Sequence, residues 1–187
     1  MSIGTELTPD RLPPKRSRLG VALQNTPRLL EIAYKSTATL FKTARPLLER
    51  LGFERVNGLI DGPEEFTKKV MFDCKMCGQC VLHSTGMTCP MTCPKNLRNG
   101  PCGGVRQNGN CEVVPDMKCV WVMAFERSQK MGAYGADMMM LNPPVNRTLE
   151  GESAWVNMVT GVDKEVPEGW VGLSTVAVVP KSKTPWR

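Results

Sequence analysis

The placement of cysteine constrains this chain more than any other feature of its sequence. All eight cysteines lie within one quarter of the 187 residues. They are Cys74, Cys77, Cys80, Cys89, Cys93, Cys102, Cys111 and Cys119. Between them the chain is punctuated by glycine, proline and asparagine and has little periodicity. We therefore expect loops and turns there, and no long helices or strands.

Nothing in the sequence suggests an oxidising compartment. The N-terminal residues have no apolar stretch after their charges, as a secretory signal would. No run of about 18 apolar residues is present to span a membrane. We expect a cytoplasmic protein with no membrane association, in which clustered cysteines hold metal more often than they form disulfides. A disulfide scaffold is the weaker alternative.

The first three cysteines favour an iron–sulfur cluster. Cys74, Cys77 and Cys80 form a C-x2-C-x2-C run, in which each short spacer lets the chain wrap a corner of a cubane, as in ferredoxins. Structural zinc sites usually take their cysteines in separated pairs from two loops. Each [4Fe–4S] cluster takes four thiolates, so two clusters would use every cysteine of the chain.

The residues around the later cysteines agree with this interpretation. Cys89 and Cys93 are each followed by proline, which steers the chain away after a ligand. Glycines beside Cys102 let the backbone approach an inorganic core and offer N–H groups to sulfur. Cations outnumber anions between the first and last cysteine, which would offset buried anionic clusters. The cations are Lys75, Lys95, Arg98, Arg106 and Lys118, against Glu112 and Asp116.

Zinc is the main alternative, because two sites of four cysteines fit the same count. A catalytic thiol would need a nearby base, and the chain has one histidine, His83, within the cysteine region. His83 could replace a cysteine as a ligand, but we expect a partly exposed residue that binds no metal. The sequence does not divide the cysteines between clusters, because the fourth ligand of such a run can come from far along the chain.

Helices are expected before the cysteines. Thr26 and Pro27 indicate a helix start, and apolar residues then recur at three- and four-residue steps. Pro46 should end or kink this helix, and a short second piece should close at Gly52. Residues 57–63, "NGLIDGP", are typical of a turn-rich joint.

One more helix and then extended chain are expected after the cysteines. Residues 116–132 favour a helix that ends near Gly132, and residues 174–180, "STVAVVP", favour an edge strand. Trp121 and Trp155 are expected in the core.

The predicted fold is a small, irregular α+β fold. It has N-terminal helices, a loop-rich core in which cysteines ligate metal, and an extended C-terminal arm. We divide the chain into a flexible arm at residues 1–26, a metal-cluster domain at 27–160 and an extension at 161–187.

Several motifs resemble one known family. They are C-x-x-C-G-x-C at Cys74–Cys80, C-P-x-x-C-P-K-x-x-x-N-G-P-C-G-G at Cys89–Gly104, G-x-C-E-V at Gly109–Val113, and C-V-W at Cys119–Trp121. Together with "PPVNRTLEGESAWVN" at Pro143–Asn157, they are similar to the methylenetetrahydrofolate reductase C-terminal family. The "PKNLRNGPCGG" motif is specific, because ferredoxins and zinc ribbons do not carry it.

The resemblance implies a small partner subunit of methylenetetrahydrofolate reductase. In that family the cysteines are taken to bind iron–sulfur clusters, with zinc as a competing assignment, and the resemblance extends this role to all eight cysteines here. It implies a partner chain that is a TIM barrel carrying FMN or FAD. This chain itself shows no G-x-G-x-x-G turn after a strand and no P-loop. We expect it to be non-catalytic alone and to relay electrons through two [4Fe–4S] clusters.

Two other functions stay open at this stage. Zinc sites could fold a purely structural docking subunit of the same complex, or the chain could be a redox carrier for another C1 demethylation enzyme. Nucleic acid is not an expected partner. The net charge is +6, but lysine and arginine are spread along the chain and form no basic run.

Overall fold

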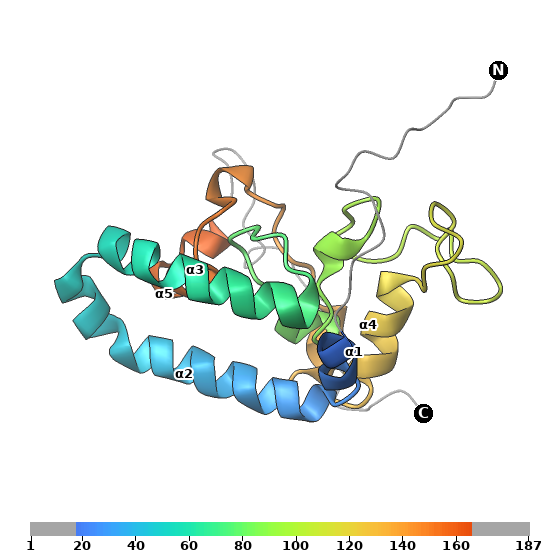
Figure 1. Cartoon of the computed structure of the whole chain (residues 1–187), viewed down its shortest axis with the longest axis horizontal. Helices are drawn as coiled ribbons and strands as arrows, with labels where there is room; N and C mark the ends of the chain where they lie inside the picture. The colour runs from blue at the N-terminus through green and yellow to red at the C-terminus, as the bar shows by residue number, and fades with distance from the viewer. Residues whose placement is uncertain (1–17, 166–187) are drawn as a thin grey trace, which may run out of the picture.

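The computed structural model describes residues 18–165, and helices form its framework (Figure 1). The α-helices are α1 (Arg18–Gln24), α2 (Pro27–Leu51), α3 (Phe53–Phe72), α4 (Val120–Ser128) and α5 (Ala154–Thr160). Short 3-10 turns connect them: η2 (Leu82–Thr85), η3 (Pro90–Thr92), η4 (Gly135–Met139), η5 (Arg147–Leu149) and η6 (Val162–Lys164).

The predicted α+β class is wrong for the part of the chain that the structure describes. That part contains no strand or sheet, and only two isolated antiparallel bridges, Val105 with Cys111 and Asn110 with Lys118. The cysteine region turns too often for two strands to stay paired. The strand expected at residues 174–180 lies outside the described residues.

Helix α2 confirms both predicted boundaries but not the predicted break. It begins at Pro27 and stops at Gly52. The φ angle of Gly52 is 85°, a value that residues inside a helix do not adopt. It continues through Pro46 to Leu51, so the prediction that Pro46 separates two pieces is wrong. Side chains on both sides of Pro46 are held by packing: Phe41 stacks on Trp155 with ring centroids 5.7 Å apart, and Leu48 is half-buried.

Helix α3 occupies the segment predicted to be a turn-rich joint. It runs unbroken through residues 57–63, so that prediction is also wrong. Val56 and Glu64 are buried on either side of this segment. Within it, the side-chain oxygen Oδ1 of Asn57 accepts a hydrogen bond of 3.0 Å from the Ser153 N–H, which ties the helix to the start of α5. Tertiary contacts thus outweigh the local turn signals.

Helix α1 lies within the residues expected to be an arm, and hydrogen bonds join it to α3 and α4. Gln24 is buried, and its amide Nε2 donates to the Met71 carbonyl at the end of α3 over 2.5 Å. The Arg127 guanidinium of α4 donates to Gln24 Oε1 over 2.9 Å and to Thr88 Oγ1 over 2.8 Å. These bonds hold α1 and α4 against the cysteine region.

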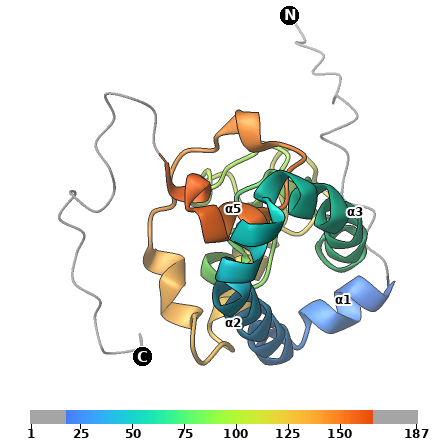
Figure 2. The ribbon, with the colours of Figure 1, turned by 90° about the vertical axis from the view of Figure 1, so that its left-hand side faces the viewer.

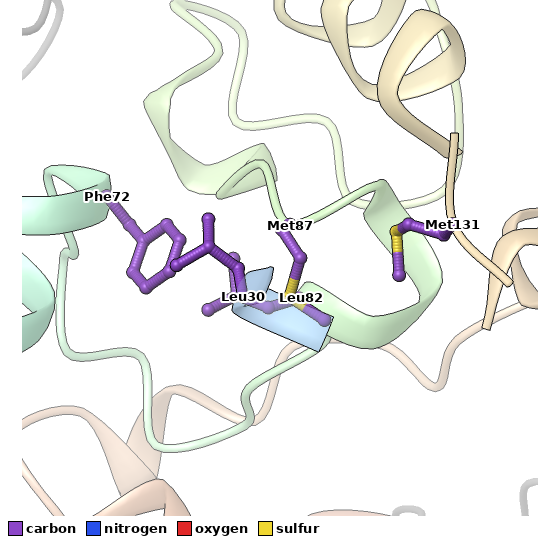
Figure 3. Close-up of a cluster of buried hydrophobic side chains, with 5 residues drawn as sticks. All are labelled: Leu30, Phe72, Leu82, Met87 and Met131. Carbon is purple, nitrogen blue, oxygen red and sulfur yellow. The ribbon is translucent and has the colours of Figure 1, made fainter. Parts of the chain in front are cut away.

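The largest apolar core lies where α2, α3 and the cysteine region meet. Figure 3 shows its members, which come from segments far apart in the sequence: Leu30, Phe72, Leu82, Met87 and Met131. Two smaller clusters centre on Val120 and on Trp121, whose burial confirms the prediction for this tryptophan. The core therefore closes over the loops that carry the cysteines.

Helices α2 and α3 form a long antiparallel hairpin, and α5 packs against both of them (Figure 2). The cysteine region lies at the end of this hairpin, between α3 and α4 (Figure 1). Helix α4 ends at Ser128, earlier than predicted, because the chain then turns onto the Glu31 carboxylate. In residues 18–165 no helix combines the length and apolar character that a membrane span requires.

Candidate metal centre

The eight cysteines separate into two groups of four, and each group surrounds its own cavity. The first cavity is lined by Cys74, Cys77, Cys80 and Cys89. The second is lined by Cys93, Cys102, Cys111 and Cys119. Neither cavity shares a cysteine with the other, so every cysteine that the sequence predicts as a ligand falls into one group.

The first group is assembled by the end of α3 and the loop that follows it. Asp73 terminates α3 in the left-handed conformation and turns the chain at Cys74. Gly78, with φ of 70°, lies so close to the Leu149 backbone that a Cβ would collide with it. Cys89 then precedes η3 in extended conformation. The loop can follow this course only because residue 78 is glycine.

The second group is assembled by two short backbone pairings and the start of α4. The Cys111 N–H donates to the Met117 carbonyl over 2.8 Å, and the Cys119 N–H donates to the Gly109 carbonyl over 3.0 Å. Cys119 is also the residue from which α4 begins. Cys93, Cys111 and Cys119 are buried, whereas Cys102 is exposed.

Both cavities are narrow in this structure. The first has a volume of about 30 Å³ and the second about 10 Å³. Among the described residues, no three His, Cys, Asp or Glu side chains converge closely enough to hold a metal ion. A bound metal group would therefore draw the sulfur atoms of each group into a new arrangement, and a cubane would also widen the cavities.

Burial makes two thiols of the first group, Cys74 and Cys89, hard to ionise without a positive counter-charge. Burial, with a contribution from Cys80, raises the pKa of the Cys74 thiol to about 12. Burial likewise raises the pKa of Cys89, with Cys74 and Cys77 adding to the effect. Thiolate is the form that binds metal. A cationic metal centre would supply this compensation.

Backbone N–H groups already point at two of the sulfur atoms. The Met76 N–H lies 3.3 Å from Cys74 Sγ, and the Gly104 N–H lies 3.3 Å from Cys102 Sγ. Such donors stabilise thiolate and, in metal sites, tune the centre that the sulfur binds. The bond from Gly104 agrees with the role expected of the glycines beside Cys102.

Arg98 is a buried cation beside the first cavity. It lines that cavity, its exposed fraction is 7%, and its Nε and Nη1 atoms have no hydrogen-bond partner in the described chain. Burying a guanidinium without a partner is costly unless an anion balances it. A metal centre ligated by four thiolates is negatively charged, and this charge would balance the Arg98 guanidinium. Asp163 lies within electrostatic reach of Arg98 but accepts no hydrogen bond from Nε or Nη1. The donor set and these two unpartnered donors therefore fit a tetrathiolate metal group.

A second buried cation, Lys68, borders the same cavity. Burial by itself lowers the pKa of its ammonium, but the Cys80 sulfur and the Glu64 carboxylate outweigh burial and raise the pKa above its usual value. The Lys68 Nζ also lies 4.8 Å from the centre of the Trp155 ring. Lys68 is thus held charged at the wall of the cavity.

Glu64 connects Lys68 to the start of α5. Its carboxylate accepts a hydrogen bond from the Ser153 hydroxyl and a bond of 3.2 Å from the Ala154 N–H. The Ser153 oxygen in turn accepts from the Val156 N–H over 3.3 Å, which caps α5. The segment Ser153–Trp155 therefore closes the wall of the first cavity on the side of α3.

The remaining predicted residues lie farther from the cavities. His83 is half-buried, lines neither cavity, and has its Nδ1 3.4 Å from Asp137 Oδ2. Of the five cations expected to offset the clusters, Arg98 is the buried one. The other four are exposed, and Lys75, Lys95 and Lys118 form ion pairs with Asp73, Glu112 and Glu126.

Two features of the site escaped the sequence analysis. Lys68 was not singled out, because Glu64–Lys68 and Glu65–Lys69 have the same four-residue spacing and nothing local distinguishes the buried pair from the exposed one. The division of the cysteines was left open. Cys89 joins the C-x2-C-x2-C run while Cys93, only four residues later, belongs to the other group, and no spacing rule indicates this.

Comparison with known proteins identifies the family. The sequence model of the family described as "Methylene-tetrahydrofolate reductase C terminal" matches residues 53–148, a little over half of the chain. The chain belongs to this family. The matched segment contains all eight cysteines, Lys68 and Arg98. No curated protein and no solved structure matches the chain.

Proposed function

We propose that this chain is the iron–sulfur electron-transfer subunit of a methylenetetrahydrofolate reductase. The observation that carries the proposal is the division of all eight cysteines into two groups of four, each around its own cavity. Membership of the family links the chain to this reductase. Four thiolates are the ligand set of a [4Fe–4S] cluster.

The cysteine groups define which residues would hold each cluster. Cys74, Cys77, Cys80 and Cys89 would hold the first, and Cys93, Cys102, Cys111 and Cys119 the second. When bound, such clusters would accept and pass single electrons. Arg98 and Lys68 would balance negative charge at the first site, and the Gly104 N–H would donate to the Cys102 sulfur at the second.

Folate chemistry is assigned to a partner chain in this proposal. We propose a partner that is a TIM barrel and carries FMN or FAD, with this chain docked against it. Here the chain's own residues position the sulfur ligands, exclude water from seven of the eight thiols to differing degrees, and leave Cys102 exposed.

The second candidate function is a zinc-stabilised docking subunit of the same complex. The narrowness of the second cavity, about 10 Å³, favours it, since one zinc ion is smaller than a cubane. Zinc would supply folding free energy without electron transfer. Metal analysis of the purified protein separates the two candidates.

A reconstituted assay tests the electron-transfer proposal. The flavin-containing reductase is supplied with methylenetetrahydrofolate and a low-potential one-electron donor, with and without this chain, in the absence of oxygen. We expect methyltetrahydrofolate formation to depend on the chain and to fall at least tenfold with either Cys80→Ser or Cys111→Ser. The exposed Ser36 on α2 offers a control, and Ser36→Ala should behave as the wild type.

Three other outcomes are informative. Formation of methyltetrahydrofolate that is equally fast without the chain would contradict the proposal. Full activity of both cysteine variants would contradict the role of the cysteines and support a docking subunit. Rapid exchange of electrons with other C1 enzymes, but none with the reductase, would support the redox-carrier alternative.

A further inference from the structure

A groove on the surface adjoins the first cysteine group and has no role in the function proposed above. Its volume is about 650 Å³, within the range typical of small-molecule sites. It lies between the second half of α3, the loop that carries the first cysteines, and the turn η5. The lining includes Cys74 and Cys77, which also line the first cavity. A ligand in the groove would therefore touch the wall of the candidate metal site.

The wall that the groove shares with the first cavity, called its floor below, is rich in sulfur. Met76 and Met91 line both the groove and the first cavity, alongside the two cysteines. Methionine sulfur makes favourable contacts with aromatic rings and adapts to their shape. The floor is thus suited to a flat ring more than to a chain of hydroxyl or phosphate groups.

The rim of the groove is polar but electrically balanced. Each of its three cations is paired with a neighbouring carboxylate: Lys69 Nζ lies 2.5 Å from Glu65, Lys75 Nζ lies 3.3 Å from Asp73, and Arg147 Nη1 lies 2.6 Å from Glu150. Among the described residues that line the groove, no cation is left over to bind a phosphate or a polyanion. The part of a ligand that lies in the groove is therefore expected to be neutral, with polar edges.

Unusual backbone conformations are concentrated at the groove. Asp73, Met76 and Asn96 line it, and they are three of the four non-glycine residues with positive φ in the described chain, at 52°, 44° and 51°. Asp73 ends a helix, where this conformation is common, but Met76 and Asn96 do not. Left-handed backbone at such residues is disfavoured and gathers at functional sites. Asn96 brings an exposed amide, which can donate and accept, to this rim.

We propose that this groove binds a neutral ring of the pteridine type, the ring system that flavins and folates share. The ring would lie on the Met76 and Met91 sulfur atoms, and its lactam edge would pair with the Asn96 amide. Cys74 and Cys77 would lie directly beneath it. This inference rests on the proposed function for its choice of redox-active ring, but it concerns binding and requires no electron transfer.

Riboflavin is the first probe, because it carries the ring without a phosphate. Binding is followed by the quenching of its fluorescence in the full-length, metal-loaded protein without oxygen. Glu65→Trp fills the groove from α3 and should weaken binding at least tenfold. Glu54→Trp is the matched control, since Glu54 lies on the same helix, is exposed and does not line the groove; this variant should bind as the wild type does.

Two further probes sharpen the result. FMN should bind no more tightly than riboflavin, because each cation in the described lining is already paired with a carboxylate. Binding of FMN alone would overturn the inference. Tetrahydrofolate shows whether the natural ligand is a folate or a flavin. Displacement of riboflavin by micromolar tetrahydrofolate assigns the groove to folate. Failure of tetrahydrofolate to displace riboflavin assigns the groove to flavin. Absence of riboflavin binding, or equal binding by Glu65→Trp and Glu54→Trp, would also overturn it.

Iron and sulfide are determined on the same samples, so that this inference and the proposed function can fail separately. Iron-loaded protein that binds no ring would contradict only the groove assignment. Protein that contains zinc without iron but still binds riboflavin in a Glu65-dependent manner would contradict only the electron-transfer function.

Discussion

The Lys68 ammonium lies 2.5 Å from the Glu64 carboxylate, and both side chains are buried beside the first cysteine group. One residue further along α3, Lys69 lies 2.5 Å from Glu65, and both of these side chains are largely exposed. The two pairs share helix, residue types and spacing, and they differ in burial. They therefore isolate what burial does to an ion pair in this protein.

Replacing each lysine by methionine should separate the two pairs. Lys68→Met leaves the Glu64 carboxylate buried without its cation, which typically costs about 3–5 kcal/mol. Lys69→Met removes a surface pair worth about 0–1 kcal/mol. Urea denaturation without oxygen, followed by helical circular dichroism, measures both changes. Equal losses for the two variants would show that the first pair is not buried as described.

The division of the cysteines predicts how serine substitutions combine. Cys80→Ser and Cys111→Ser should each remove about half of the bound iron, because each disables one of two independent sites. Adding Cys89→Ser to Cys80→Ser should remove no more, since both line the first cavity. Combining Cys80→Ser with Cys111→Ser should remove nearly all of it. Iron content per chain is the measurement, and a different pairing pattern would refute the division.

Glu31 of α2 fixes the chain that follows α4. Its carboxylate accepts backbone hydrogen bonds from Gly132 at 2.9 Å, Ala133 at 2.7 Å and Tyr134 at 2.6 Å. Burial acts to raise the pKa of Glu31, but these donors, with a contribution from Arg28, lower it below the ordinary value of 4.5. The ionised form is thus stabilised in the folded protein.

Glu31→Gln should destabilise the protein at pH 7 by about 2 kcal/mol, the scale of a hydrogen bond to a charged group. Because the folded-state pKa is below the unfolded value of 4.5, this stabilisation is fully present above pH 4.5 and is lost as the pH falls through the folded-state pKa. The difference in unfolding free energy between wild type and variant should therefore shrink below pH 4.5. A difference that stays constant or grows as the pH falls would contradict this assignment.

Gly86 is the point where the cysteine region approaches α4. It has φ of 60°, and a Cβ there would collide with the Ala124 carbonyl and the Ser128 N–H. Gly161, with φ of 91° and no atom nearby, is the matched control. Gly161→Ala should cost only the left-handed strain, about 1–2 kcal/mol. Gly86→Ala should cost about 1–3 kcal/mol more from overpacking, as measured by the shift in the urea midpoint.

Local signals predicted some helix boundaries and failed at others for an identifiable reason. Pro27 and Gly52 define the ends of α2 because proline and glycine act there through their own backbone angles. Pro46 and residues 57–63 lie inside helices because their neighbours pack on α5 and on Ser153, contacts that no local pattern reveals. The described part contains no strand because the cysteine region turns too often, and the expected strand at residues 174–180 lies outside the described residues.

The location of the candidate site was predictable from the sequence, whereas the arrangement of its cysteines was not. Crowding and spacing identified the cysteine region, and its looped character is confirmed in the structure; the role of the cysteines as ligands stays a prediction. Which cysteines face one another depends on how the loop from Gly78 to Cys89 closes over α3, a tertiary property. The burial of Lys68 and of Arg98 likewise depends on α5 and on the cysteine loops packing around them.

Iron and acid-labile sulfide in protein purified without oxygen test the central claim most directly. Two [4Fe–4S] clusters predict about eight iron and eight sulfide per chain, with a brown colour that dithionite bleaches. Colourless protein with about two zinc ions per chain and no labile sulfide would contradict the account.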